Sequence, residues 1–386
     1  MGWLWIMQAE AKARHIFICA GEVSGDIHGA ALIRALQQTS PDVRISAIAG
    51  AAMREAGCEQ LFPMESLNVM GLVDVLKALP RIRQIGRELC EWVEKERPDL
   101  VILIDFPGFN MRVGEKIRQL GVPVLYYIAP KLWAWGRWRV KRLKRAQDRL
   151  ACILPFEERW FGAKGIQANY VGNPSAAISQ GGWSMAVLKT RLGVAASEPL
   201  LALLPGSRKG ELARHVPLLL ESFLQLKQKI PTLKAVTTRA PSVTDIQLQP
   251  LLDAGVQLLD RLEEGYALRA DAAIAVSGTA TLELALWDTP TVLVYQNSPV
   301  TMWIGQKLVG THCVGLANII LDDEEIMPEL LQAEASVEAV VQHVLPLLEG
   351  SDAATQQRAA FQQLRQRLGD SNPSEQVAKM ALEMMA

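Results

Sequence analysis

The sequence predicts an α/β protein with two doubly wound domains, each built on a parallel sheet. Short apolar runs typical of buried strands alternate with longer segments of helical pattern, and this βαβ order implies a parallel sheet. The alternation occurs in both halves of the chain. With 386 residues, 49% of them hydrophobic, the chain also exceeds what one core usually holds, so two domains are expected.

In the first half, apolar runs end in turns rich in Gly, Asp and Pro. Strands are expected over 15–20, 44–49, 99–104, 122–128, 149–154 and 167–171. Helices are expected from the turn at 21–26 to about residue 38, and over 80–96 and 110–120. Gly172, Asn173 and Pro174 form the best linker candidate, which places the first domain at about 1–176.

The second half has the same organisation. Strands are expected over 200–204, 233–238, 272–276 and 291–294, with a helix from Arg208 to about 230. From about 325 to the end the pattern is almost wholly helical. We therefore expect a second domain at 177–345 and trailing helices at 346–386, which either cross back to the first domain or pair with a second subunit. The two Rossmann-like domains would face each other across a cleft.

Four polar loops follow predicted strands. They lie at 21–26, 105–110, 205–208 and 277–279. Because ligands of open α/β sheets bind at the carboxyl ends of the strands, these loops are the candidate ligand sites.

The loop at 277–279 offers a socket for a nucleotide diphosphate. Ser277, Gly278 and Thr279 separate a buried strand from a helix, whose free N–H groups favour an anion. Glu283 lies one turn into that helix, where its carboxylate can accept hydrogen bonds from ribose hydroxyls. An ordinary strand-to-helix turn, with Gly278 serving only chain geometry, explains the same residues.

Composition excludes several classes of protein. A formal net charge of −1 excludes a globally basic nucleic-acid binder. Five scattered cysteines without a Cys-x-x-Cys pair suit free thiols in a reducing cytoplasm. The histidines are isolated and there is no Asp-x-Asp motif, so no metal site is expected. The N-terminus lacks the features of a secretory signal, and no apolar run approaches the roughly 18 residues of a membrane span.

Six motifs together resemble the lipid A disaccharide synthase family. They are AGEVSGD (20–26), VMG (69–71), YIAPKLWAW (127–135), LPFEE (154–158), LLPGSR (203–208) and SGTATLE (277–283), in the family's order. The resemblance implies an inverting glycosyltransferase of the GT-B fold without a cofactor. Such an enzyme moves 2,3-diacylglucosamine from its UDP derivative onto 2,3-diacylglucosamine 1-phosphate, forming a β-1,6 disaccharide.

Three positions depart from the family pattern. Gly108 stands where the family has a second Asp, Asn173 replaces the His of Gly-His-Pro, and Ala317 replaces the Pro of Leu-Pro-Asn. These departures keep a noncatalytic, membrane-associated paralogue that binds a nucleotide or lipid among the alternatives. A UDP-sugar epimerase of the same architecture is the other.

The candidate general base is Asp105, which follows the buried run DLVILI. Its alternative role is to cap the following turn. Asp26 with His28 is the competing pair. Arg208 could donate bidentate hydrogen bonds to the phosphate oxygens of departing UDP. The alternative is a surface arginine paired with Glu211.

The resemblance suggests further contacts. Asn318 and Gln332 match nucleotide-facing positions. The acceptor side is assigned to Glu22, Ser24, Asn110 and Trp133.

Two segments suggest a peripheral site on an anionic membrane, on the cytoplasmic face of the inner membrane. The first combines Leu72, Val75 and Leu76 with Arg81 and its neighbours, and the second places Trp133, Trp135 and Trp138 beside Arg139 and Arg142. The alternative is that the leucines and tryptophans belong to the core. Acyl-chain preference and oligomeric state, including a homodimer, stay open.

Overall fold

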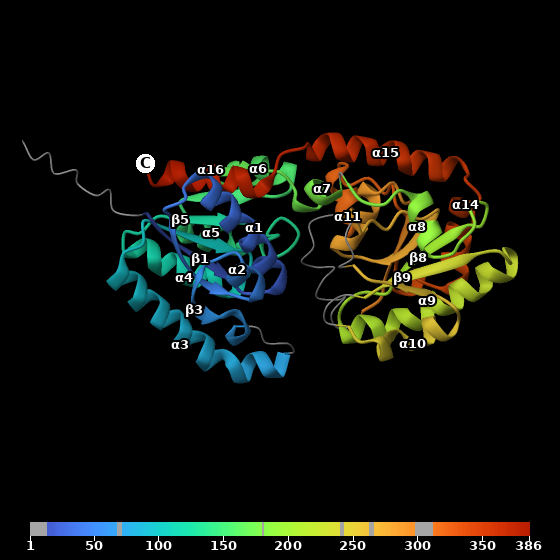
Figure 1. The fold of residues 1–386 in the computed structure, drawn as a ribbon, viewed down its shortest axis with the longest axis horizontal. Coiled ribbons are helices and arrows are strands. Elements are labelled where there is room, and N and C mark those ends of the chain that lie inside the picture. Colours follow the sequence, from blue (N-terminus) through green and yellow to red (C-terminus); the bar gives the residue numbers. More distant parts are fainter. Residues whose placement is uncertain (1–13, 68–71, 180, 240–242, 262–265, 298–311) are drawn as a thin grey trace, which may run out of the picture. The chain divides into compact units, whose positions relative to one another are not determined.

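The structure is a computed structural model that describes residues 14–67, 72–179, 181–239, 243–261, 266–297 and 312–386. The chain forms two compact units (Figure 1). Unit 1 contains Met1–Gly172 and Ser371–Ala386, and unit 2 contains Asn173–Asp370.

Unit 1 is built on a seven-stranded parallel sheet in the order β3-β2-β1-β4-β5-β6-β7. Its strands are β1 (His15–Ala20), β2 (Arg44–Ala49), β3 (Glu59–Pro63), β4 (Leu100–Ile104), β5 (Val124–Tyr127), β6 (Arg149–Cys152) and β7 (Ala168–Tyr170). The central strands are apolar on both faces because helices cover both faces, as a parallel sheet requires.

The helices of unit 1 come from both ends of the chain. They are α1 (Val23–Thr39), α2 (Ala51–Glu55), α3 (Leu72–Glu96), α4 (Pro107–Gln119), α5 (Val140–Ala146), α6 (Pro155–Gly162) and α16 (Pro373–Met384). Figure 1 shows the C-terminal helix α16 beside α1, against which it packs. Val377 and Ala381 of α16 are fully buried in the same core cluster as Ile33, so the last helix completes the N-terminal core of its own chain.

Unit 2 is built on a six-stranded parallel sheet in the order β10-β9-β8-β11-β12-β13. Its strands are β8 (Leu200–Leu204), β9 (Lys234–Thr238), β10 (Gln257–Leu259), β11 (Ala272–Val276), β12 (Thr291–Tyr295) and β13 (Glu329–Leu331). Its helices include α7 (Pro174–Ser179), α8 (Met185–Arg191), α9 (Lys209–Lys229), α10 (Asp245–Asp253), α11 (Thr279–Leu286), α13 (Leu316–Ile320), α14 (Val337–Leu348) and α15 (Asp352–Leu368).

The predicted fold class is confirmed, and three short strands were missed. The expectation of an almost wholly helical chain from 325 is wrong, because β13 pairs with β12 from Glu329 to Leu331. β3 and β10 were also absent from the prediction. Each missed strand is short or only partly buried, so it carries no apolar run of its own.

Each sheet has a topological switch point between two central strands. In unit 1, β1 is flanked by β2 and β4, so chain connections diverge at β1 and β4. In unit 2 the same divergence occurs at β8 and β11. The four polar loops predicted from the sequence follow these four strands, and each switch point therefore carries two of them.

Candidate active site

Asp105 follows β4 at the switch point of unit 1 in an unusual backbone conformation. Asp105 and Phe106 both have φ of 44°, which is left-handed and costs about 1–3 kcal/mol per residue for such side chains. Two donors hold the strained segment: the Tyr126 hydroxyl, 2.6 Å from the Asp105 carbonyl oxygen, and Asn110 Nδ2, 2.9 Å from it. The surrounding structure thus holds the backbone from which the Asp105 side chain extends.

The environment of Asp105 makes its carboxylate a stronger base. Burial, with a smaller contribution from the negative charge of Glu22, raises the pKa of Asp105 to about 6. Lys131 and the backbone N–H of Phe106 act in the opposite direction. A carboxylate with this pKa is ionised at neutral pH and accepts a proton more readily than an ordinary Asp.

The other candidates near the first helix differ in exposure. Glu22 and Ser24 are exposed at the start of α1. His28 is half-buried, with its ring centroid 6.4 Å from that of Tyr127. Burial lowers the pKa of His28, which favours the neutral imidazole. The negative charge of Glu22 thus acts on the Asp105 carboxylate. The ring of His28 packs against β5, the strand next to β4.

Asp26, the competing candidate for the base, has a structural role in unit 1. Its carboxylate is 4% exposed and accepts hydrogen bonds from the backbone N–H groups of Gly50, Ala52 and Met53 at 2.8–3.2 Å. These groups lie at the start of α2, whose first N–H groups have no partner within the helix. Asp26 therefore caps α2 and ties α1 to it.

Two residues predicted to contact the acceptor, Asn110 and Trp133, are buried and have partners within unit 1. Asn110 is fully buried, and its amide holds the Asp105 segment. Trp133 is 4% exposed and donates its indole N–H to Glu157 Oε1 at 2.8 Å. Burial raises the pKa of Glu157 to about 7. Glu157 was missed in the sequence, although it lies at the third position of α6, from which a Glu side chain commonly accepts from the backbone N–H of the N-cap residue, here Leu154 at 3.2 Å.

In unit 2, the loop after β8 presents Arg208 to solvent. The Arg208 side chain is 83% exposed, and its Nη1 lies 3.3 Å from Glu211 Oε1. The pairing with Glu211 considered for this arginine is therefore present. Glu211 Oε2 also accepts from the backbone N–H groups of Ser207 and Arg208, so a carboxylate already caps the start of α9.

Among the described residues, no carboxylate caps the loop after β11 in this way. Gly278 and Thr279 are exposed where α11 begins, and the hydroxyl of Ser277 donates to the carbonyl oxygen of Val314 at 3.1 Å. The first N–H groups of a helix attract anions. Of the two helix starts at this switch point, the start of α11 is the better place for a phosphate.

Glu283 forms an ion pair that the sequence did not indicate. Arg261 Nη2 lies 2.6 Å from Glu283 Oε2, and the two side chains are 31% and 24% exposed. Burial raises the pKa of Glu283, and Arg261 opposes the rise. The 22 residues between the partners explain why no local pattern revealed the pair.

The two remaining nucleotide candidates have different environments. Asn318 is fully buried, and its amide is bonded to both backbone groups of Met327 and to Glu329. Gln332 is half-buried in a left-handed conformation with φ of 55°, and its side chain pairs with the backbone of Asn297. Asn318 thus positions the segment before β13.

The predicted membrane residues are only partly described. The side chains of Leu72, Val75 and Leu76 lie outside the described residues. Trp133 is core, whereas Trp135 and Trp138 are 51% and 65% exposed. Arg81 is exposed.

Arg139 and Arg142 both have partners within unit 1. Arg139 donates to the carbonyl oxygen of Pro107 at 3.1 Å, and Arg142 lies 3.7 Å from Glu115. Within the described ranges, no helix is long and apolar enough to cross a bilayer.

Among the residues that the structure describes, no group of three or more His, Cys, Asp or Glu side chains is arranged to hold a metal ion. The two arginines considered in unit 2, Arg208 and Arg261, each pair with a glutamate.

Two α/β units, each with a parallel sheet, are the fold shared by GT-B glycosyltransferases and related epimerases. The glycotransferase of kitacinnamycin superposes with a TM-score of 0.63 at 15% identity, covering 97% of this chain and 100% of that one. The UDP-GlcNAc 2-epimerase of Neisseria meningitidis, solved with UDP-GlcNAc, gives 0.62 at 13% identity, covering 96% and 100%. At these identities the likeness concerns the fold alone, which both classes share.

Sequence similarity distinguishes between these classes, which the fold does not. Residues 16–383 match the family described as lipid-A-disaccharide synthetase. The lipid-A-disaccharide synthase of Trichlorobacter lovleyi is 39% identical over 383 residues, which cover 98% of this chain and 99% of that protein. That of Coxiella burnetii is 31% identical, covering 95% and 97%. The chain belongs to this family and is a glycosyltransferase.

Proposed function

We propose that this enzyme transfers 2,3-diacylglucosamine from its UDP derivative to 2,3-diacylglucosamine 1-phosphate, forming a β-1,6-linked disaccharide and releasing UDP. The observation that carries the proposal is the carboxylate of Asp105 at the switch point of unit 1, on a backbone held by Tyr126 and Asn110 and with its pKa raised to about 6. The family match supports a disaccharide as product.

In this reaction Asp105 accepts the proton of the acceptor's 6-hydroxyl. The hydroxyl oxygen forms a bond to the anomeric carbon of the donor, while the bond from that carbon to the β-phosphate oxygen of UDP breaks. UDP leaves with the electron pair. Attack opposite the leaving group inverts the anomeric centre and requires no covalent enzyme intermediate.

Unit 2 binds the donor in this proposal. Three features support it: the exposed guanidinium of Arg208, the uncapped start of α11 at Gly278 and Thr279, and the carboxylate of Glu283. The first two stabilise the negative charge that grows on the diphosphate as UDP departs. Glu283, with one oxygen held by Arg261, retains lone pairs for the ribose hydroxyls.

The deciding experiment is incubation of the purified protein with both acylated glucosamine substrates, followed by mass spectrometry. The expected products are the disaccharide and an equal amount of UDP, formed also with a chelator present. The Asp105→Asn variant serves as the control for catalysis by the protein itself. Conversion of the donor to an epimer, without disaccharide, would contradict the proposal.

We also propose that the enzyme binds the anionic inner face of the cytoplasmic membrane. Exposed Trp135 and Trp138, with Arg139 under the Trp135 ring at 6.0 Å, combine aromatic and cationic groups suited to a headgroup region. Vesicle flotation tests this proposal. Flotation should require anionic lipid, weaken with salt and decrease in a Trp135→Ser, Trp138→Ser variant. Failure of the wild type to float at low salt would contradict it.

A further inference from the structure

A groove between α3 and α4 of unit 1 has no role in the reaction as proposed. One stretch of it has a volume of ≈ 550 Å³, and an adjoining stretch has ≈ 340 Å³. The two share Arg87 and Lys116 in their linings, so they form one continuous groove along the helix pair. The larger stretch reaches Gly108 in the first turn of α4, three residues after Asp105.

Four exposed cations line the larger stretch. Arg83 and Arg87 come from α3, and Arg112 and Lys116 from α4, each pair separated by one helical turn. No acidic residue belongs to this lining, and none of the four cations has an ion-pair partner among the residues that the structure describes. Like charges at this spacing repel one another, and a bound anion would relieve the repulsion.

The floor of the same stretch is apolar. Phe109 and Val113 are 5% and 3% exposed, and half-buried Ile82 contributes from α3. Cations above an apolar floor complement a molecule that carries both an anionic group and hydrocarbon. Phosphate oxygens suit the guanidinium groups, and acyl chains suit the floor.

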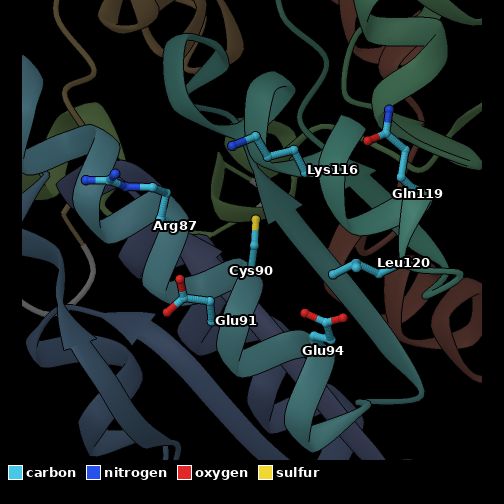
Figure 2. A pocket seen from close by; sticks show the side chains of 7 residues that line it. All are labelled: Arg87, Cys90, Glu91, Glu94, Lys116, Gln119 and Leu120. Atoms are coloured by element: carbon cyan, nitrogen blue, oxygen red, sulfur yellow. The ribbon is translucent and has the colours of Figure 1, made fainter.

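The charge of the groove changes along its length. In the smaller stretch, Glu91 and Glu94 accompany the cations, and Figure 2 shows them further along α3 from Arg87, with Lys116 extending from α4. An anion therefore prefers the other end, beside Gly108. There the positive end of the α4 dipole adds to the attraction, and a Cβ on Gly108 would meet no atom within 4 Å.

We propose that this end of the groove binds the phosphate of the acceptor, a phosphomonoester of an acylated sugar, with acyl chains along the apolar floor. The inference rests on the proposed function and adds to it the means by which the enzyme selects a phosphorylated acceptor. Arg83 and Arg112, one from each helix, are the principal phosphate ligands.

The test compares the Arg83→Gln, Arg112→Gln double variant and each of its single variants with wild type, using Arg34→Gln, an exposed arginine on α1, as the charge-matched control for the single variants. Assays use neutral detergent micelles, so that attraction to anionic lipid plays no part. Loss of two charge-assisted contacts should raise the KM for the phosphorylated acceptor at least about 10-fold. The KM for the donor and kcat at saturating acceptor should stay within about twofold. With a dephosphorylated acceptor, the variant and wild type should behave alike.

A second variant changes the charge without removing an arginine. Gly108→Asp adds a carboxylate at the phosphate end, with Gly108→Asn as the neutral control of similar size. The Asp variant alone should raise the acceptor KM.

Unchanged acceptor KM in both the double variant and Gly108→Asp would overturn the inference. So would a defect confined to anionic vesicles, which would assign the groove to bulk phospholipid. If wild type forms no disaccharide, the proposed function itself has failed, and the two failures are thus distinguishable.

Discussion

The two switch points lie at equivalent places in their sheets but hold their polar groups in opposite ways. In unit 1, Asp105 is half-buried, and its strained backbone is held by Tyr126 and Asn110. In unit 2, Arg208 is 83% exposed, and its contact with Glu211 is an exposed ion pair of the kind worth about 1 kcal/mol or less. This difference suits the two proposed roles. A general base such as Asp105 benefits from partial desolvation and a held backbone, whereas a phosphate ligand such as Arg208 has to exchange partners as substrate enters and product leaves.

The largest effect is expected from Asp105→Asn, which keeps the shape of the side chain and removes its basicity. Turnover should fall about 10²–10⁴-fold while UDP binding persists, because unit 2 is unchanged. Rapid-quench kinetics and calorimetry with UDP measure the two quantities. Near wild-type turnover, with chemistry shown to be rate-limiting, would remove Asp105 from the mechanism.

Arg208→Gln should lower turnover about 10- to 100-fold, as expected for loss of a charge-assisted contact to the leaving group. Glu211→Gln is the matched control. If the exposed pair is merely a resting contact, that control should leave turnover within a few-fold of wild type. Equal losses in the two variants would mean that the pair acts as a structural unit, and the contrast between the two switch points would then weaken.

Asp26→Asn should destabilise the protein by about 1–3 kcal/mol, since an amide cannot accept three backbone hydrogen bonds as a carboxylate does. Urea unfolding measures this change. The folded fraction should retain turnover close to wild type. A loss of turnover as large as that of Asp105→Asn, with little change in stability, would restore Asp26 as a catalytic candidate.

The pH dependence of kcat/KM should report the ionisation of Asp105. The carboxylate is the active form, so the rate should decline below its pKa of about 6, approaching tenfold per pH unit. Initial rates between pH 4.5 and 8 at low acceptor concentration, with the enzyme shown to stay folded, provide the test. An acid limb near pH 4 would show that Asp105 is not desolvated in the free enzyme.

The smallest effect is a gain in stability in Asp105→Asn. Since folding raises the pKa of Asp105 from 3.8 to about 6, wild type loses stability as pH rises through that interval, and the Asn variant does not. The variant should therefore be more stable by about 1–2 kcal/mol at pH 8, with the difference disappearing near pH 3.5. Asn also tolerates the left-handed conformation well. A less stable variant at pH 8 would contradict the assigned cause of the pKa shift.

Long buried strands and the loops after them were predictable from the sequence, because a strand buried on both faces is a continuous run of apolar residues. The contacts of individual side chains were not. Asp26 is bonded to groups 24–27 residues away, and Glu283 to an arginine 22 residues before it. The sequence favoured Asp105 over Asp26 as the candidate base because Asp105 follows a buried apolar run, but no local pattern revealed the distant backbone groups that Asp26 binds.

The ring of Phe106 has a consequence for how this sequence can vary. It lies so close to Gly21 that a Cβ at that position would come within 2.3 Å of it. Ala at 21 should therefore be rejected while Phe stands at 106, and accepted once a small residue replaces it. Positions 21 and 106 should show epistasis in a pairwise mutational scan and should covary among relatives. The turn after β1 and the turn after β4 would then evolve as one unit.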